Sequence, residues 1–148
     1  MAFSFFTSLT NIVVSLKSSD IDNTMRAARL FNEKSGYPFH LGVTEAGNAI
    51  TSAVRSTWAL GNLLKEGIGD TIRVSINGSI EDEVLCANEI LRTMGLKKGG
   101  VRIVACPRCG RHTFDSHGFL TEIQHKLLTL NKDITVAVMG CSVNGPGE

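Results

Sequence analysis

Thr71-Ile-Arg-Val-Ser-Ile76 is the stretch that decides the fold class of this chain. Its apolar and polar residues alternate with the two-residue period of a β-strand, so the three aliphatic side chains share one face. Thr71, Arg73 and Ser75 share the opposite face. A segment with the apolar period of a helix follows directly, and a strand followed by a helix is the βα unit of a parallel sheet. The stretch therefore predicts an α/β protein.

The same order of strand and helix occurs twice upstream. Residues 11–17 and 38–44 are short runs of apolar and β-branched residues, and each precedes a helical pattern. Together with residues 71–77, they predict three successive βα units. In a βα barrel, the apolar face of each strand would pack on the helices and the polar face would look into the barrel mouth.

Each expected helix has a recognisable start or an apolar stripe. Asp20 is a suitable N-cap for a helix over the residues that follow it. Ser79 with Asp82 resembles a capping box in which aspartate replaces the usual glutamate. The helix between them is predicted from a stripe at helical spacing, formed by Ile50, Val54 and Trp58 with Ala53, Thr57 and Leu64.

A second segment begins after Met94-Gly-Leu-Lys-Lys-Gly-Gly100, which predicts a helix stop and a linker. The expected domains are therefore residues 1–96 and 97–148. The second is predicted to contain a strand at 101–105, a helix at about 119–130 and a strand at 134–139. Both strands run directly into cysteine-bearing loops, which a sheet would hold side by side.

The cysteines of this segment suggest a metal site. Cys106-Pro-Arg-Cys109 follows the first strand, Cys141 follows the second, and Glu148 supplies a carboxylate. Soft thiolates select zinc, copper(I) or iron–sulfur clusters. A carboxylate in the fourth place is harder and more easily displaced, which suggests chemistry at the metal.

Other interpretations of the thiols remain open on these residues alone. Cys-Pro-x-Cys-Gly is typical of a zinc knuckle, although such sites usually contain a second cysteine pair. A noncatalytic zinc-binding or interaction module is therefore an alternative. A thioredoxin-like dithiol fits less well because that motif normally opens a helix, and inert structural thiols fit least.

Charged residues near the strand ends suggest a second site. Lys17, Glu45 and Arg73 follow one another at equal intervals of about one βα unit, which predicts that they reach the same level at the carboxyl ends of the strands. Two cations, the Ser75 hydroxyl and one carboxylate suit an anionic, phosphate-like ligand with an acid/base group. Solvated loop residues are the plainer alternative. The histidines are His40, His112, His117 and His125. None of them indicates a function by itself.

Composition excludes some classes of function. A net charge of +1 gives no electrostatic argument for binding nucleic acid or a membrane surface. No apolar run approaches membrane-spanning length, and the first residues lack a convincing secretion signal. Four cysteines in this context fit a reducing compartment better than a disulfide framework. We therefore expect a soluble, intracellular protein.

Five motifs in order resemble the 4-hydroxy-3-methylbut-2-enyl diphosphate synthase family. They are Val13-Val-Ser-Leu-Lys17, His40-Leu-Gly-Val-Thr-Glu-Ala-Gly47, Glu66-Gly-Ile-Gly-Asp-Thr-Ile-Arg-Val-Ser75, Ala105-Cys-Pro-Arg-Cys-Gly-Arg111 and Gly140-Cys-Ser-Val-Asn-Gly-Pro-Gly-Glu148. The resemblance implies the last three βα units of a TIM-like barrel, followed by part of a small α/β domain that binds an iron–sulfur cluster.

The resemblance also implies a reaction and its partners. Family members reductively open and dehydrate 2-C-methyl-D-erythritol 2,4-cyclodiphosphate to 4-hydroxy-3-methylbut-2-enyl diphosphate, a step of the non-mevalonate isoprenoid pathway. They use a [4Fe-4S] cluster, receive electrons singly from ferredoxin or flavodoxin, and work as homodimers. Such an oxidoreductase would be located in the bacterial cytoplasm or the plastid stroma, with no nucleic-acid or membrane partner.

Roles carried over by the resemblance fall on nine positions. The implied cluster ligands are Cys106, Cys109, Cys141 and Glu148. The implied diphosphate contacts are Lys17, Arg73 and Ser75. The implied acid/base residue is Glu45, and the implied cluster-domain residue that approaches the substrate is Asn144.

The chain is shorter than the implied architecture. A TIM barrel needs eight βα units and about 250 residues. We therefore expect an internal fragment, a split gene product or a gene-model error, with the origin of residues 1–10 unassigned. An uncovered sheet edge and exposed apolar surface are expected, and activity of this chain alone is doubtful.

Overall fold

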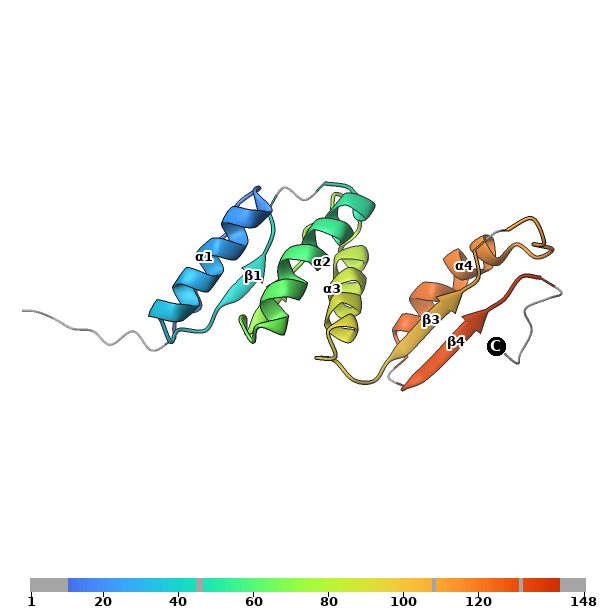
Figure 1. Ribbon diagram of the computed structural model, residues 1–148. Helices are drawn as coiled ribbons and strands as arrows, with labels where there is room; N and C mark the ends of the chain where they lie inside the picture. Colours follow the sequence, from blue (N-terminus) through green and yellow to red (C-terminus); the bar gives the residue numbers. More distant parts are fainter. Residues whose placement is uncertain (1–10, 45–46, 108, 131, 142–148) are drawn as a thin grey trace, which may run out of the picture. The chain divides into compact units, whose positions relative to one another are not determined.

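A computed structural model of the chain describes residues 11–44, 47–107, 109–130 and 132–141. The chain divides into two compact units between Lys97 and Lys98 (Figure 1). Each unit combines a short parallel sheet with α-helical structure, three helices in the first unit and one in the second among the described residues, which confirms the α/β class. Within the described residues, none of the helices has both the length and the apolar character needed to cross a bilayer.

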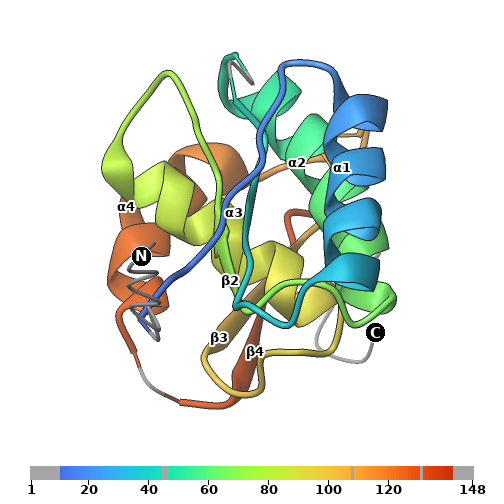
Figure 2. The ribbon, with the colours of Figure 1, turned by 90° about the vertical axis from the view of Figure 1, so that its left-hand side faces the viewer.

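The first unit alternates helix and strand. Its elements are α1 (Ile21–Lys34), β1 (His40–Gly42), α2 (Ala49–Lys65), β2 (Thr71–Arg73) and α3 (Ile80–Thr93). β1 and β2 pair in parallel, with His40 opposite Thr71 and Gly42 opposite Arg73. A parallel bridge between Val14 and Phe39 adds the segment before α1 to the other side of β1, and Figure 2 shows this blue segment beside the strand.

The strands of this sheet are shorter than the predicted ranges. Beyond Arg73, side chains satisfy the backbone groups that a longer ladder would use. Ser52 Oγ donates to the Ser75 carbonyl at 2.6 Å, and the Glu83 carboxylate accepts from the Ile76 N–H at 2.9 Å. The alternation itself is confirmed, because Val74 is buried and Arg73 is exposed.

Aliphatic and aromatic side chains from the strands and α2 form the core of this unit. Phe39, Leu41 and Val43 are at most 3% exposed, as the alternating pattern of the second strand predicts. They pack with α2 side chains such as Leu60 in one apolar cluster. Gly69 has a φ of 109°, and a Cβ there would occupy the space of the Leu41 side chain. The chain therefore needs glycine to enter β2 so close to the core.

The helix starts follow the predicted capping chemistry. Asp20 accepts a hydrogen bond from the Asn23 N–H at 2.7 Å, and Ser79 accepts one from the Asp82 N–H at 3.1 Å. Such caps satisfy backbone donors that the first helical turn leaves unpaired. In the first turn of α3, the Glu83 carboxylate reaches back and accepts a hydrogen bond from the Ile76 N–H, just after β2.

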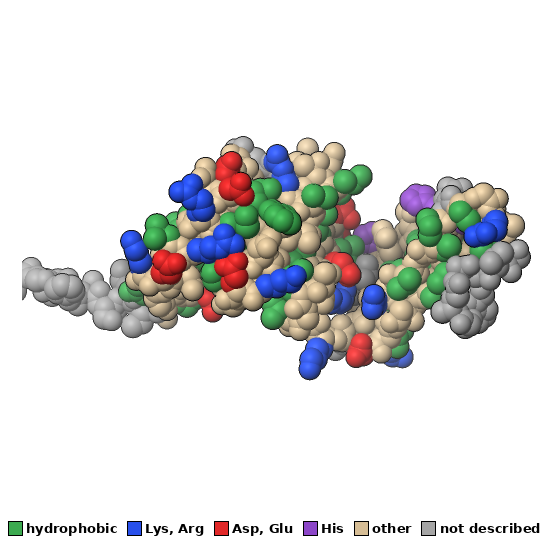
Figure 3. Space-filling model, in the orientation of Figure 1, with side chains coloured by type: hydrophobic (Ala, Val, Ile, Leu, Met, Phe, Trp, Pro, Cys, Tyr) green, Lys and Arg blue, Asp and Glu red, His purple; other side chains and the backbone are tan. Residues whose placement is uncertain are grey.

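The stripe that predicted α2 is largely exposed, although its Leu64 belongs to the buried face. Ile50, Val54 and Trp58 are 79%, 66% and 61% exposed, and apolar side chains gather on the surface over α2 (Figure 3). The buried face of α2 instead consists of Ser52, Ser56, Ala59, Leu60, Gly61, Leu63 and Leu64. Small residues allow this face to approach its neighbours closely, which decides the orientation of the helix.

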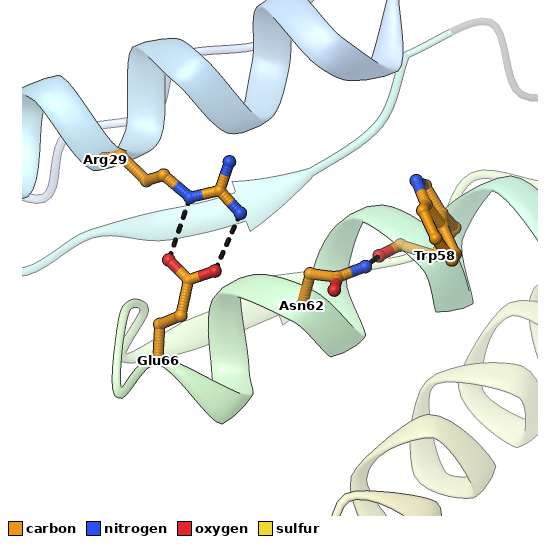
Figure 4. A network of polar contacts seen from close by, with 4 residues as sticks. All are labelled: Arg29, Trp58, Asn62 and Glu66. Carbon is orange, nitrogen blue, oxygen red and sulfur yellow. Dashed lines mark hydrogen bonds and ion pairs between the residues drawn. The ribbon is translucent and has the colours of Figure 1, made fainter.

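A two-pronged ion pair joins α1 to the end of α2. Arg29 donates from Nε and Nη2 to the Glu66 carboxylate at 2.8 and 2.7 Å (Figure 4). The pairing lowers the pKa of Glu66 and raises that of Arg29, mainly through these hydrogen bonds. Both side chains are about two-fifths exposed, so the pair orients the helices more than it stabilises them.

The second unit contains β3 (Val101–Ala105), α4 (Ser116–Leu128) and β4 (Ile134–Val138). β3 and β4 pair in parallel over their whole length, from Val101 opposite Ile134 to Ala105 opposite Val138. The predicted strands and their pairing are confirmed. α4 begins earlier than predicted because Asp115 caps it, accepting a hydrogen bond from the Gly118 N–H at 3.2 Å.

Candidate functional site

One face of the first sheet carries the polar side chains predicted for the strand ends. The pairing of Val14 with Phe39 and of Gly42 with Arg73 brings Lys17, Gly42 and Arg73 to one level across three neighbouring segments. A Cβ built on Gly42 would lie 3.1 Å from Lys17 Cε and 3.3 Å from Lys17 Nζ. The lysine side chain therefore crosses the sheet over the glycine, toward the strand that carries Arg73.

Gly42 has a structural role in this arrangement. Its missing side chain leaves space for Lys17 on one side and for the Arg73 carbonyl, 3.2 Å from the built Cβ, on the other. Any larger residue would displace the lysine or the neighbouring strand. The glycine thus allows two cationic residues to approach each other on one face.

In the register of the strands, Gly42 lies level with Lys17 and Arg73. The predicted level of Glu45 stays a prediction. Glu45 itself lies outside the described residues.

Lys17 and Arg73 are close enough for their charges to interact. Burial and the neighbouring Arg73 charge together lower the pKa of the Lys17 ammonium. Like charges held close together raise the energy of the free protein, and a bound anion would relieve the repulsion. The arrangement is chemically suited to an anionic ligand. Ser75 follows Arg73 on the same face and is partly buried.

His40 belongs to the same polar face, and sequence reasoning missed it. Its Nδ1 lies 2.8 Å from Thr71 Oγ1 on the paired strand. Burial, then the charges of Lys17 and Arg73, lower the pKa of the His40 imidazole. The available signal was its position two residues before Gly42, which places it on the polar face of the strand.

The second unit brings the cysteine loops together as predicted. Cys106 continues the ladder after β3, since its N–H donates to the Val138 carbonyl at 3.1 Å. Cys141 follows β4 and forms an antiparallel bridge with His112. The Cys109 carbonyl accepts from the His112 N–H at 3.0 Å, which links the two loops through one histidine.

The His112 ring lies against the second cysteine loop. A Cβ built on Gly140 would lie 2.6 Å from both Nδ1 and Cε1 of His112, so glycine is needed for this contact. The Thr113 N–H and hydroxyl both donate to the Gly140 carbonyl, at 2.8 and 3.2 Å. These contacts fix the loop that leads into Cys141.

Thiols are present on adjacent loops without forming a closed metal site among the described residues. Cys109 is exposed, and Cys106 and Cys141 are partly buried. In the described part of the chain, no three His, Cys, Asp or Glu side chains are arranged to hold a metal ion. Glu148 and Asn144 lie outside the described residues. The donor set and its placement on neighbouring strand ends nonetheless fit a thiolate-held metal group.

The fold and the two sites define an α/β protein with a cationic sheet face and a separate cysteine-bearing unit. Comparison with known families agrees with this class. The profile described as the GcpE TIM-barrel domain matches residues 5–88, and that described as the GcpE protein C-terminal domain matches residues 102–148. The chain therefore belongs to the GcpE family.

Curated relatives are similar over most of this chain. Proteins named 4-hydroxy-3-methylbut-2-en-1-yl diphosphate synthase (flavodoxin) from Treponema pallidum and Treponema denticola are 56% and 52% identical, over 93% and 92% of the chain. The Campylobacter concisus protein of that name is 48% identical over 94% of the chain. The matches cover 34%, 35% and 40% of those proteins, so the chain spans about a third of their length.

Proposed function

We propose that this chain is part of a 4-hydroxy-3-methylbut-2-enyl diphosphate synthase, comprising the last three βα units of its barrel and part of its cluster domain. The reaction is the reductive opening and dehydration of 2-C-methyl-D-erythritol 2,4-cyclodiphosphate. The observation that carries the proposal is the family match through both units, together with the cationic face at Lys17 and Arg73.

The diphosphate would bind on the cationic face. Lys17 supplies a compact ammonium charge, and Arg73 supplies a planar guanidinium that can bind two phosphate oxygens at once. Ser75 adds a hydroxyl donor from the same strand end. Because the two cations repel each other in the free protein, ligand binding gains the relief of that repulsion.

Glu45 is proposed as the acid/base residue, since a carboxylate beside bound phosphate can hold or release the proton that dehydration requires. Asn144 is proposed to approach the substrate from the cluster domain, where its amide can donate and accept hydrogen bonds. Both assignments rest on the motifs in which these residues stand.

The cluster would be held by Cys106, Cys109, Cys141 and Glu148. When bound, a [4Fe-4S] cluster with one carboxylate-held iron would supply electrons and a Lewis-acidic position for a substrate oxygen. The chain's own part is to hold the three thiolates on the ends of β3 and β4 and to keep Glu148 exchangeable. His112 supports that geometry through its contacts to both cysteine loops.

The remaining partners follow from the relatives. Their names specify flavodoxin, so we propose flavodoxin in preference to ferredoxin as the electron donor. Homodimer formation is proposed for the complete protein. The named relatives are bacterial, which favours the bacterial cytoplasm over the plastid stroma.

Anaerobic reconstitution with iron and sulfide tests the cluster assignment. We expect the 148-residue chain to take up a brown chromophore, and the Cys106→Ala and Cys141→Ala variants to lose it. Cys86→Ala is the matched control, because this thiol lies within α3 and burial raises its pKa. Stoichiometric zinc binding without cluster assembly would instead support a noncatalytic zinc module.

Calorimetry with the cyclodiphosphate tests the other site. Arg73→Ala is expected to weaken binding about tenfold to a hundredfold, the loss of one or two charge-assisted hydrogen bonds. Lys65→Ala, an exposed cation in the last turn of α2, is the matched control and should leave affinity unchanged. Equal affinities for the protein and its Arg73→Ala variant would refute the phosphate role of Arg73.

A further inference from the structure

His40 lies on the cationic face to which the proposed function assigns phosphate binding. That proposal gives His40 no role. It is paired with Thr71 in the register that also pairs Gly42 with Arg73. The Ser15 hydroxyl donates to the His40 carbonyl at 2.9 Å, which ties β1 to the segment that ends in Lys17. The imidazole therefore belongs to the same rigid row of strands as both cations.

The contact between His40 and Thr71 is compatible with either charge state of the ring. Nδ1 lies 2.8 Å from the Thr71 hydroxyl oxygen. A hydroxyl can donate to the bare nitrogen of a neutral imidazole or accept from the N–H of an imidazolium. Protonation of His40 thus retains this hydrogen bond, so the backbone and side-chain geometry of the free protein also suits the charged ring.

The free protein opposes that protonation. Burial has the largest effect in lowering the pKa of His40, followed by the charges of Lys17 from the segment before α1 and of Arg73 from β2. Within the described residues, these two cations are the charged groups that act on the ring. Both would be neutralised by an anion bound between them.

We propose that a phosphate-type anion bound at Lys17 and Arg73 drives proton uptake by His40, which then becomes the third cation of the site. The proton comes from solvent and remains on the imidazole while the anion is bound. This proposal rests on the phosphate role of Lys17 and Arg73. It adds a proton linkage that the family assignment and the motifs do not specify.

The sign of the linkage follows from the two states of the ring. In the free protein, burial and the two cations lower the pKa of His40, whereas in the complex the anion raises that pKa. Binding therefore takes up a proton at pH values between the two pKa values, and affinity gained from His40 increases as the pH falls through that window. A positioning role that involves only hydrogen bonding to Thr71 would produce no such uptake.

Nuclear magnetic resonance of the ring Cε1–H groups tests the proposal directly in the 148-residue chain. The chain has four histidines, and the signal lost in His40→Gln identifies the one of interest. The pKa of His40 is measured in the free protein and with saturating inorganic pyrophosphate. We expect the anion to raise it by about one unit or more, the usual effect of an opposite charge in direct proximity.

An Arg73→Gln variant supplies a second measurement that needs no ligand. Removing this cation should raise the pKa of His40 in the free protein, while the exposed Lys65→Gln control should leave it unchanged. If His40→Gln does not fold, the His40 signal can be assigned by elimination with variants of His112, His117 and His125.

The possible outcomes distinguish the proton linkage of His40 from the proposed phosphate site on which it rests. Pyrophosphate binding with a raised His40 pKa supports the linkage. Binding that is lost in Arg73→Gln but leaves the His40 pKa unchanged overturns the linkage and keeps the phosphate site. Absence of pyrophosphate binding, or binding that Arg73→Gln does not weaken, overturns both.

Discussion

The unit up to Lys97 has short strands and a large apolar core, whereas the unit from Lys98 has longer strands and few buried side chains. β1 and β2 span three residues each, yet twelve apolar residues among those described in the first unit are buried in one cluster. β3 and β4 span five residues each, but the buried side chains of the second unit are Val101, Val138 and Ser116 among the described residues.

The difference predicts that the unit with the longer ladder is the less stable of the two. Backbone hydrogen bonds exchange for bonds to water on unfolding and contribute little net stability, whereas burial of apolar surface supplies the main driving force. The second unit also carries the three thiols. We therefore expect its stability to depend on a bound metal group, because metal binding contributes directly to folding in small units with little core.

The largest expected effect is a cavity in the first core. Leu60→Ala removes a side chain that is 0% exposed and should lower the free energy of unfolding of this unit by about 2–5 kcal/mol. Urea denaturation followed by Trp58 fluorescence measures it, because Trp58 is the single tryptophan and lies on the same helix.

Val54→Ala is the control on that helix, since Val54 is 66% exposed and should change stability by less than about 0.5 kcal/mol. A large loss in Val54→Ala would mean that the exposed stripe is covered in solution. Equal losses in both variants would contradict the assignment of the buried face.

Cluster loading should stabilise the second unit alone. At metal-group concentrations a hundredfold above the dissociation constant, amide exchange in β3 and β4 should slow by about a hundredfold, equivalent to about 2.7 kcal/mol. Hydrogen exchange read by mass spectrometry resolves the two units. β1 and β2 serve as the internal reference, and protection that persists in Cys106→Ala would show that the effect does not depend on the thiols.

A smaller effect is expected from one hydroxyl that joins α2 to the end of β2. Ser52 and Ser56 are both fully buried on α2, but Ser52 Oγ donates to the Ser75 carbonyl at 2.6 Å. Within the described structure Ser56 Oγ has no hydrogen-bond partner. Ser52→Ala should cost about 1 kcal/mol in thermal or urea unfolding, since it leaves a partly buried carbonyl without that donor.

Ser56→Ala is the matched control, being the same change one helical turn later. It should be neutral or slightly stabilising, because it removes a buried polar group without a partner. A larger loss from Ser56→Ala than from Ser52→Ala would contradict the hydrogen bonding described for α2.

The smallest effect concerns the exposed pair of Arg29 and Glu66. Pairing lowers the pKa of Glu66 in the folded protein, so its stabilising contribution is present above the usual carboxyl pKa. It is lost as the pH falls through the lowered value. Glu66→Gln should therefore lower stability slightly at pH 7 and have no effect in strong acid. If Glu66→Gln lowers stability by the same amount at every pH, the side chain contributes through packing and not through its charge.

Much of the local structure could be predicted from particular residues. Asp20 and Ser79 identified helix starts because the oxygen of an N-cap side chain accepts a hydrogen bond from an N–H only a few residues later. This requirement is local, so it can be read from the sequence. The alternation around Phe39, Leu41 and Val43 identified a buried strand face because successive side chains of a strand point to opposite sides. The CxxC motif and Cys141 were correctly placed on adjacent strand ends.

The candidate site was predicted only in part. Lys17 and Arg73 do meet on one face, but the register puts Gly42 between them and adds His40 beside them. The alternating pattern places both residues on the polar face of their strand, but only the pairing across the sheet shows that they lie beside Lys17 and Arg73. Roles for Glu45, Asn144 and Glu148 remain predictions from the motifs.

The sequence by itself determined the α/β class, the helix starts, the polar and apolar faces of the strands, and the placement of the cysteines on adjacent strand ends. These features depend on interactions within a few residues of the chain. The tertiary structure decided the register of the strands and the face of α2 that is buried. Both depend on how segments far apart in the sequence pack, and helix and loop lengths, together with small residues such as Ser52 and Gly61, set that packing.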